Sequence, residues 1–254
     1  MVTRIPIATQ IWPVREEFLK DMPGTFEAIA IMGYDGVELC YYWPEVWDNA
    51  AGIRNVCADL GLEVVGAHVP WEHMSSDRLK QLIEFSHTVG MKYPIVPGLP
   101  DEMRTSRAGL LEASGRLNEL ADMLKPEGLC TGYHNHTWEF SPLDGELPFD
   151  TIFGNTVSDV IMQLDIGNGL RGNADPILYL ERYAGRATTV HLKEFSATNE
   201  HALIGEGDVD WEEVFALCES TGGTEWYIVE QESGIYPPLE CTERCLVNLR
   251  EMGK

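Results

Sequence analysis

The chain has 254 residues, of which 44% are hydrophobic, and its formal net charge is −23. The hydrophobic share is enough for a folded core and excludes a disordered chain. The negative charge excludes nucleic acid as a partner, because binding by phosphate neutralisation needs a basic surface.

Short apolar runs alternate with longer amphipathic runs along the whole chain. The short runs are rich in Val, Ile and aromatic residues and are bounded by turn residues, which predicts strands. The longer runs have helical spacing, and several stop at a Gly, which commonly ends a helix. In chain order we predict strand 5–11, helix 15–32, strand 36–40, helix 47–60, strand 63–69, helix 77–89, strand 94–96, helix 106–124, strand 129–134, helix 147–153, strand 160–165, helix 176–182, strand 188–193, helix 211–220, strand 226–230 and helix 240–252.

This order of elements predicts an α/β fold, the (β/α)8 TIM barrel, as a single domain over residues 1–254. Strands that alternate with helices imply a parallel sheet with helical crossovers, and eight such units close into a barrel. The competing fold, a doubly wound sheet, would carry a G-x-G-x-x-G turn after an early strand. The chain has no such turn, and its comparable stretch at residues 205–208 is acidic and late.

Membrane and thiol chemistry are both disfavoured. No apolar run approaches the ~18 residues that span a bilayer. Residues 1–10 lack a signal-peptide pattern, so we expect a cytoplasmic protein with no membrane partner. None of the six cysteines forms a C-x-x-C pair. Cys241 and Cys245 would share a helix face, but no His or second Cys pair lies nearby to complete a zinc site, so we expect buried free thiols.

Ionisable side chains lie at the ends of most predicted strands, on the face where TIM barrels hold their active sites. Burying so many unpaired charges would be costly in an ordinary core, whereas a shared cation would stabilise them. The sequence therefore predicts a metal site at the carboxyl ends of the strands. The residues concerned are Glu38, His68, His134, His136, Asp165, His191, Lys193, Glu230 and Glu232.

The ligand set that we predict is Glu139, Asp165, His191 and Glu230. Three carboxylates and one imidazole form an oxygen-rich site, so Mn²⁺ is the expected metal, with Mg²⁺, Co²⁺ and Zn²⁺ as alternatives. Asp165 and His191 end successive strands and should be neighbours. The stretch after Asp165, Ile-Gly-Asn-Gly, is no helical pattern, which disfavours a simple helix cap. Glu139 lies past its strand, in a predicted loop.

Catalytic roles are assigned to three side chains. His134 is the candidate base because an ordinary imidazole has a pKa of ~6.5. Glu230 is a second proton carrier, and Lys193 would bind a substrate oxygen or an oxyanion. Strand alternation should point His134 and His136 to the same side. Substrate contacts are expected from His68, His136, Lys193, Trp12, Glu38 and Glu232.

Aromatic residues follow several strands, where they would either stack on a sugar or cover the core. They are Trp12, Tyr41, Tyr42, Trp43, Trp71 and Trp138.

Several motifs resemble the xylose isomerase-like barrel superfamily, which holds sugar phosphate isomerases/epimerases, ketose 3-epimerases, inosose dehydratases and family-two apurinic endonucleases. The resemblance covers nearly the whole chain and implies a metal bound by an acid, an Asp, a His and an acid in chain order. It also implies proton removal beside a carbonyl that the metal polarises, and it favours a dimer. The motifs are Gly-Tyr-His-Asn-His-Thr-Trp-Glu-Phe at 132–140, Leu-Asp-Ile-Gly-Asn at 164–168, Val-His-Leu-Lys at 190–193, Ile-Gly-Glu-Gly at 204–207 and Val-Glu-Gln at 229–231.

The chain departs from the superfamily pattern at one position. Many epimerases of the group carry a Glu where this chain has His134, so Glu139 would supply the first ligand from further along. The His-Asn-His form is similar to dehydratase and keto-glycoside-cleaving relatives, in which proton removal leads to elimination.

We therefore expect a metal-dependent isomerase or epimerase that acts on a small, non-phosphorylated ketose or keto-sugar. The alternative is a lyase or dehydratase that shares the first step and then loses a β-substituent. A non-catalytic sugar-binding barrel would need no metal ligands. A repair nuclease of the superfamily would need several zinc ions and more His residues than the seven present.

Overall fold

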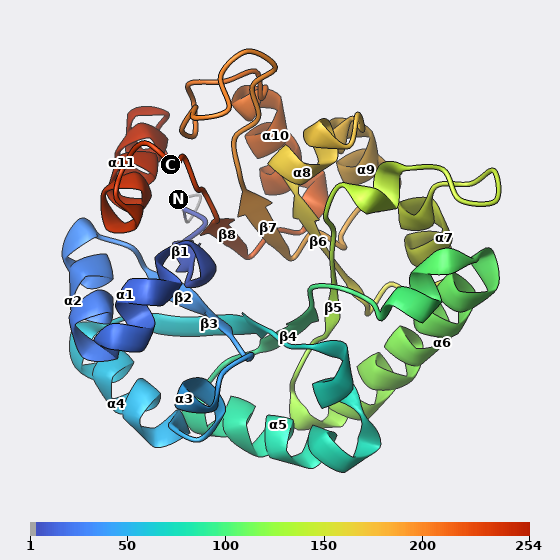
Figure 1. The fold of residues 1–254 in the computed structure, drawn as a ribbon, viewed down its shortest axis with the longest axis horizontal. Coiled ribbons are helices and arrows are strands. Elements are labelled where there is room, and N and C mark those ends of the chain that lie inside the picture. The colour runs from blue at the N-terminus through green and yellow to red at the C-terminus, as the bar shows by residue number, and fades with distance from the viewer. Residues whose placement is uncertain (1–3) are drawn as a thin grey trace.

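The computed structural model describes residues 4–254. Residues 1–10 were expected to contain no signal peptide, and the first three of them lie outside the described range. Within that range eight parallel strands pair in sequence order, and β8 pairs with β1 to close a barrel. Figure 1 shows the strands at the centre and the helices around them. The predicted (β/α)8 TIM barrel is confirmed. The strands are β1 (Ile7–Gln10), β2 (Gly36–Cys40), β3 (Glu63–His68), β4 (Tyr93–Val96), β5 (Gly132–His134), β6 (Ile161–Asp165), β7 (Thr189–Leu192) and β8 (Trp226–Val229).

The barrel interior has an apolar layer below a polar one. Because side chains alternate along a strand, Ile161, Gln163 and Asp165 of β6 point to the same side. Ile161 belongs to a buried apolar cluster with Tyr93 and Ile228, whereas Gln163 is hydrogen-bonded to Glu38 of β2 across the barrel. The apolar layer fills the amino-terminal end of the barrel, and the polar side chains collect toward its carboxyl-terminal end, where the site lies.

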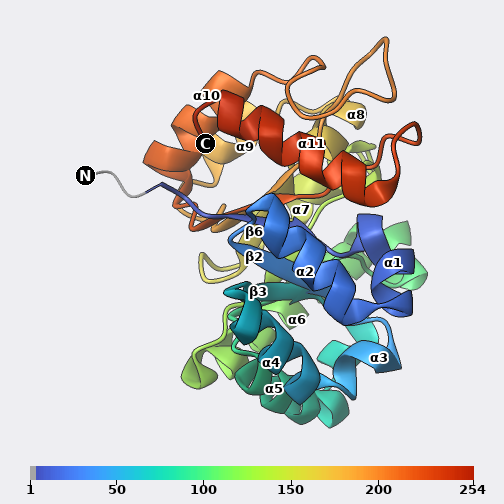
Figure 2. The same ribbon diagram turned by 90° about the vertical axis from the view of Figure 1, so that its left-hand side faces the viewer.

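Eleven α-helices surround the described barrel and bury apolar faces against the outside of the strands. None of the helices in residues 4–254 is long and apolar enough to cross a membrane. α11 lies beside α2 where β8 meets β1 (Figure 2). The helices are α1 (Arg15–Lys20), α2 (Met22–Met32), α3 (Pro44–Trp47), α4 (Ala50–Leu60), α5 (Ser76–Val89), α6 (Arg107–Leu124), α7 (Pro148–Gly154), α8 (Ile166–Arg171), α9 (Pro176–Arg182), α10 (Trp211–Leu217) and α11 (Pro238–Glu251).

Three details of the helix prediction were wrong. The helix predicted over 15–32 breaks at Asp21, whose carboxylate caps α2 by accepting from the backbone N–H of Gly24, while Pro23 has no N–H to continue α1. The helix predicted from residue 47 starts at Ala50, after the separate turn of α3. The short helix α8 follows Asp165 directly, where no helix was predicted, and Asp165 caps it by accepting from the N–H of Asn168, so the sequence argument against a helix cap was also wrong.

The thiol prediction is confirmed. All six cysteines are free, and five of them are buried, with Cys130 only partly so.

Candidate metal centre and active site

Four buried side chains from successive strands lie close enough to share one metal ion. His134 ends β5, Asp165 ends β6, His191 lies in β7, and Glu230 directly follows β8. One ligand atom from each residue lies within 4.8 Å of the others. Asp165 and His191 are paired in the register of β6 and β7, so these predicted neighbours do lie side by side.

Two atoms of this group have unmet bonding capacity. Nδ1 of His134 and Oδ2 of Asp165 are buried and have no hydrogen-bond partner. Oδ2 of Asp165 lies 4.0 Å from Nε2 of His134. Buried polar atoms without a partner are rare and costly in native proteins. A divalent cation bound among these side chains would satisfy them, so the residues present fit a metal ion.

The protonation states of His134 and Glu230 also suit a cation. Burial, with His191 and His68, lowers the pKa of His134 well below its usual range, so the ring is neutral, the form that binds metals. Burial raises the pKa of Asp165 although Lys193 opposes the shift. Burial acts in the same direction on Glu230, but Lys193 and His191 hold its pKa well below its usual range.

His191 is held between two carboxylates. Its Nδ1 lies 2.8 Å from Oε2 of Glu230, and its Nε2 lies 2.7 Å from Oε2 of Glu38. Burial alone would lower the pKa of His191, but the two carboxylates raise it to about 10. Glu38 is 0% exposed and also accepts from the side-chain amides of Gln10 and Gln163. Glu38, expected as a substrate contact, therefore lies beneath His191 with no surface toward the barrel mouth.

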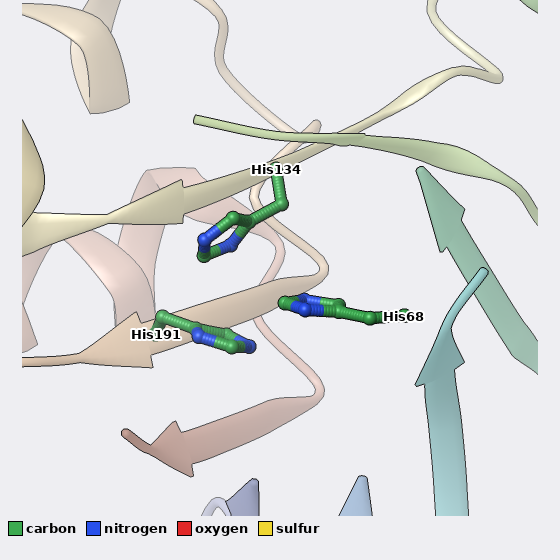
Figure 3. A group of neighbouring side chains, drawn as sticks. All are labelled: His68, His134 and His191. Carbon is green, nitrogen blue, oxygen red and sulfur yellow. The ribbon is translucent and has the colours of Figure 1, made fainter. Parts of the chain in front are cut away.

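A third imidazole joins His134 and His191 inside the barrel. Figure 3 shows the rings of His68, His134 and His191 pointing toward one another. They come from β3, β5 and β7, and alternate strands supply one layer of side chains in a TIM barrel. Nε2 of His68 lies 2.7 Å from Oε1 of Gln163, so this ring has a protein partner. His68 is buried, which leaves it little access to a substrate.

The structure does not bring Glu139, the ligand predicted after β5, into the four-residue group. The carboxylate of Glu139 accepts from the hydroxyl of Tyr133, at 2.6 Å, and from the backbone N–H of His136, at 2.9 Å. Burial raises the pKa of Glu139 to about 7. Glu139 thus braces the turn that carries His136, and His134 occupies the position toward the other ligands.

His136 and Lys193 lie above the group, nearer the solvent. The ring of His136 is partly exposed and packs edge-on against His134, with 5.0 Å between ring centroids. Burial of its inner side lowers the pKa of His136 to about 4, although Glu230 opposes the shift. Nζ of Lys193 lies 3.7 Å from Oε1 of Glu230. Burial disfavours its charge, but Glu230 and Asp165 raise its pKa, so Lys193 stays protonated.

Two of the predicted substrate contacts, Trp12 and Glu232, lie on the outer rim of the mouth. Arg15 joins them, because its guanidinium lies 4.6 Å from the ring centroid of Trp12 and 3.2 Å from Oε1 of Glu232. The exposed ring of Trp12 lies parallel to that of Trp43, with 6.2 Å between centroids. Tyr42 is also exposed at this rim.

The other aromatic residues at the strand ends cover the core. Tyr41 is fully buried against Phe85, whereas Trp71 and Trp138 are partly buried and pack on the main apolar cluster.

Three amide side chains of the site were missed from the sequence. Asn135 joins β5 to β6, because its Oδ1 accepts from the N–H of Asp165 at 2.9 Å. Gln10 and Gln163 both donate to Glu38. A signal was present for Gln163, since it interrupts the apolar run Ile-Met-Gln-Leu-Asp two residues before Asp165, on the same face of the strand.

Comparison with known proteins points to one family. Residues 26–245 match the sequence model of the xylose isomerase-like TIM barrel family. The inosose dehydratase of Clostridium beijerinckii is 24% identical over 279 residues, which covers 91% of this chain and 92% of that relative. The crystal structure of a sugar phosphate isomerase/epimerase from Parabacteroides distasonis is similar at a TM-score of 0.83 and 22% identity, covering 98% of this chain and 94% of that one. A 3-keto-D-glucoside 4-epimerase from E. coli is similar at a TM-score of 0.72 and 18% identity, covering 98% and 100%. At these identities the two structures show the shared fold alone.

Proposed function

The chain belongs to the xylose isomerase-like TIM barrel family, and on this premise we propose that it is a divalent-metal-dependent enzyme that removes the proton beside the carbonyl of a small keto-sugar. The observation that carries the proposal is the pair of buried, unpartnered atoms on His134 and Asp165. We assign the metal to these two residues together with His191 and Glu230. Glu139, bonded to Tyr133, is left out of this ligand set.

Two imidazoles and two carboxylates suit Mn²⁺, and they fit Co²⁺ or Zn²⁺ better than Mg²⁺, which prefers oxygen ligands alone. When bound, such an ion polarises the substrate carbonyl as a Lewis acid and stabilises the charge that develops on its oxygen.

We assign the general base to His136 instead of His134. A base needs both a free lone pair and access to the substrate proton. His136 is exposed and can reach a substrate, whereas His134 is only 1% exposed and is enclosed by the other candidate ligands. Glu139 supports this role because it holds the backbone N–H of His136.

Lys193 supplies the matching acid. It stays protonated beside Glu230 and can hold a substrate oxygen or give a proton to a departing hydroxyl group. A base in the turn after β5 and a cationic acid directly after β7 suit β-elimination, in which a proton and a leaving group depart from neighbouring carbons. The name of the inosose dehydratase relatives agrees with this outcome.

Isomerisation or epimerisation is the second candidate, because it shares the enolising step. Epimerisation needs a second group that returns the proton to the opposite face. Glu230, the second proton carrier expected from the sequence, would have to do this, but its low pKa makes it a poor proton donor. We therefore place elimination first.

The substrate that we propose is uncharged. Two cations at the mouth already have carboxylate partners, since Lys193 pairs with Glu230 and Arg15 pairs with Glu232. A phosphate would have to compete with these partners in a protein of net charge −23.

The test is to incubate the Mn²⁺-loaded protein in deuterated water with an inosose, a 3-keto-glucoside and a ketose. We expect metal-dependent exchange of the hydrogen beside the carbonyl, followed by an enone absorbance in the ultraviolet. A new epimer without an enone would select the second candidate. Full activity after metal removal, or binding of all three sugars without exchange, would refute the proposal.

A further inference from the structure

Glu38 lies at the centre of a hydrogen-bonded layer inside the barrel, directly beneath the metal group. Three nitrogen atoms lie within 2.7 Å of its carboxylate: Nε2 of Gln10 at 2.6 Å, Nε2 of Gln163 at 2.7 Å and Nε2 of His191 at 2.7 Å. Nε2 of His68 lies further away, at 3.4 Å. A buried carboxylate is stable only when donors surround it, so each of the three short contacts needs a hydrogen directed at Glu38.

The two glutamine amides have fixed orientations. Oε1 of Gln10 accepts from the backbone N–H of Trp12, at 3.2 Å, which leaves its NH₂ group for Glu38. Oε1 of Gln163 faces Nε2 of His68, at 2.7 Å, and its NH₂ group also donates to Thr189. Neither amide can turn its oxygen toward Glu38 without breaking these bonds.

The position of the hydrogen on the His191 ring is therefore also constrained. Because two amide NH₂ groups already donate to the carboxylate of Glu38, it acts as an acceptor, and Nε2 of His191 has to carry a hydrogen and donate it. A metal ion would therefore displace the hydrogen of Nδ1, the atom beside Glu230 and facing the ligand group, and bind there.

From this arrangement we propose that Glu38 is a positioning residue, which fixes the tautomer and orientation of His191 so that Nδ1 faces the metal ion. The inference rests on the proposed metal centre. It replaces the substrate-binding role expected for Glu38, which a fully buried side chain cannot perform. A carboxylate that holds the second nitrogen of a ligand imidazole makes that ligand a stronger donor.

The decisive variant is Glu38→Gln. It keeps the shape of the side chain but adds an NH₂ group among three donors, so at least one of the three contacts must break. We expect metal affinity to fall by roughly 10–100-fold, the usual effect of losing such a partner. The matched control is Glu225→Gln at the opposite end of the barrel, where Glu225 accepts from Lys92 and Tyr93. This control removes the same charge, and we expect it to leave metal affinity unchanged.

Two measurements test the inference. Calorimetric titration with Mn²⁺ compares the wild type, Glu38→Gln and Glu225→Gln. Nitrogen-15 NMR of the Zn²⁺-loaded wild type reads the tautomer of His191 without any substitution, and we expect hydrogen on Nε2 and metal on Nδ1.

The outcomes separate this inference from the proposed function. If the wild type binds no metal, the proposed function fails and this inference falls with it. If the wild type binds metal but Glu38→Gln binds it equally well, the metal centre stands and the role of Glu38 is refuted. Should Glu38→Gln fail to fold, a spectrum with metal on Nε2 of His191 in the wild type would refute that role by itself.

Discussion

Replacing Asp165 by Asn should stabilise the metal-free protein and remove its response to metal. The carboxylate has two different surroundings: Oδ1 caps α8 by accepting from the N–H of Asn168 at 2.7 Å, whereas Oδ2 has no partner. Asn keeps the cap through its own oxygen and removes the buried charge. An unpartnered buried polar group costs about 1–3 kcal/mol, and more when it is charged. The amide nitrogen of the variant also has no partner, so the substitution removes only the extra cost of the charge, and we expect metal-free Asp165→Asn to be on the order of 1 kcal/mol more stable than the wild type.

Metal should reverse that order. At an ion concentration of about 100 times Kd, a ligand that binds only the folded state stabilises it by about 2.7 kcal/mol. For a chain of this size the gain corresponds to about 5–10 °C in Tm. The variant lacks a ligand and should gain almost nothing, so the wild type should unfold at the higher temperature once Mn²⁺ is present.

Thermal unfolding followed by calorimetry at pH 8, with chelator and then with Mn²⁺, measures both effects. The pH matters because burial raises the pKa of Asp165. Because this pKa is raised, the ionised carboxylate destabilises the folded protein at pH values above it. The destabilisation fades at acidic pH, where the folded protein binds the proton. The matched control is Asp175→Asn, since Asp175 caps the neighbouring helix α9 but lies outside the metal group. A metal-free Asp165→Asn less stable than the wild type, or one that still gains stability from Mn²⁺, would refute the reasoning.

Four further predictions concern other parts of the chain. His134→Ala should lose metal and turnover together, as metal analysis and assays will show; retained metal with turnover lowered roughly 10²–10⁴-fold would make His134 the base. His136→Gln should keep its metal and lose roughly 10²–10⁴-fold in turnover and in α-hydrogen exchange. The pKa of Glu139 is raised from 4.5 to about 7, so Glu139 should cost the metal-free wild type up to roughly 3 kcal/mol of stability as pH rises across that range, and denaturant unfolding should show a loss smaller by that amount in Glu139→Gln, where Asp165 still contributes. Removing residues 240–254 takes away the buried side chains Leu246 and Leu249, and size-exclusion chromatography should show aggregation instead of a folded monomer or dimer.

The barrel could be predicted because its pattern repeats. Each strand is short, apolar and followed by a longer amphipathic run, and the predicted strand at 36–40 has the bounds of β2. The break between α1 and α2 depends on one local competition, in which the cap formed by Asp21 prevails over the helical periodicity on both sides. The helix α8 is only six residues long and contains two Gly, so it carries almost no periodic signal.

The strand-end rule placed Asp165, His191 and Glu230 together, because neighbouring parallel strands present their carboxyl ends at one face. Whether His134 or Glu139 faces the candidate ligand group depends on where β5 stops. The strand ends at His134, and the following turn brings Glu139 to the hydroxyl of Tyr133, away from the ligand group. Spacing along the chain does not encode that change of direction. Spacing along the chain also cannot distinguish an inward side chain at the mouth from one that is buried a layer deeper. For this reason Glu38 was expected to contact substrate.

The most direct test of the metal assignment is an anomalous difference map from crystals of the Mn²⁺-loaded protein, collected at the manganese absorption edge. We expect one strong peak within bonding distance of His134, Asp165, Glu230 and Nδ1 of His191. A peak bound by Glu139 in place of His134, or no peak among these four residues at saturating Mn²⁺, would contradict the assignment.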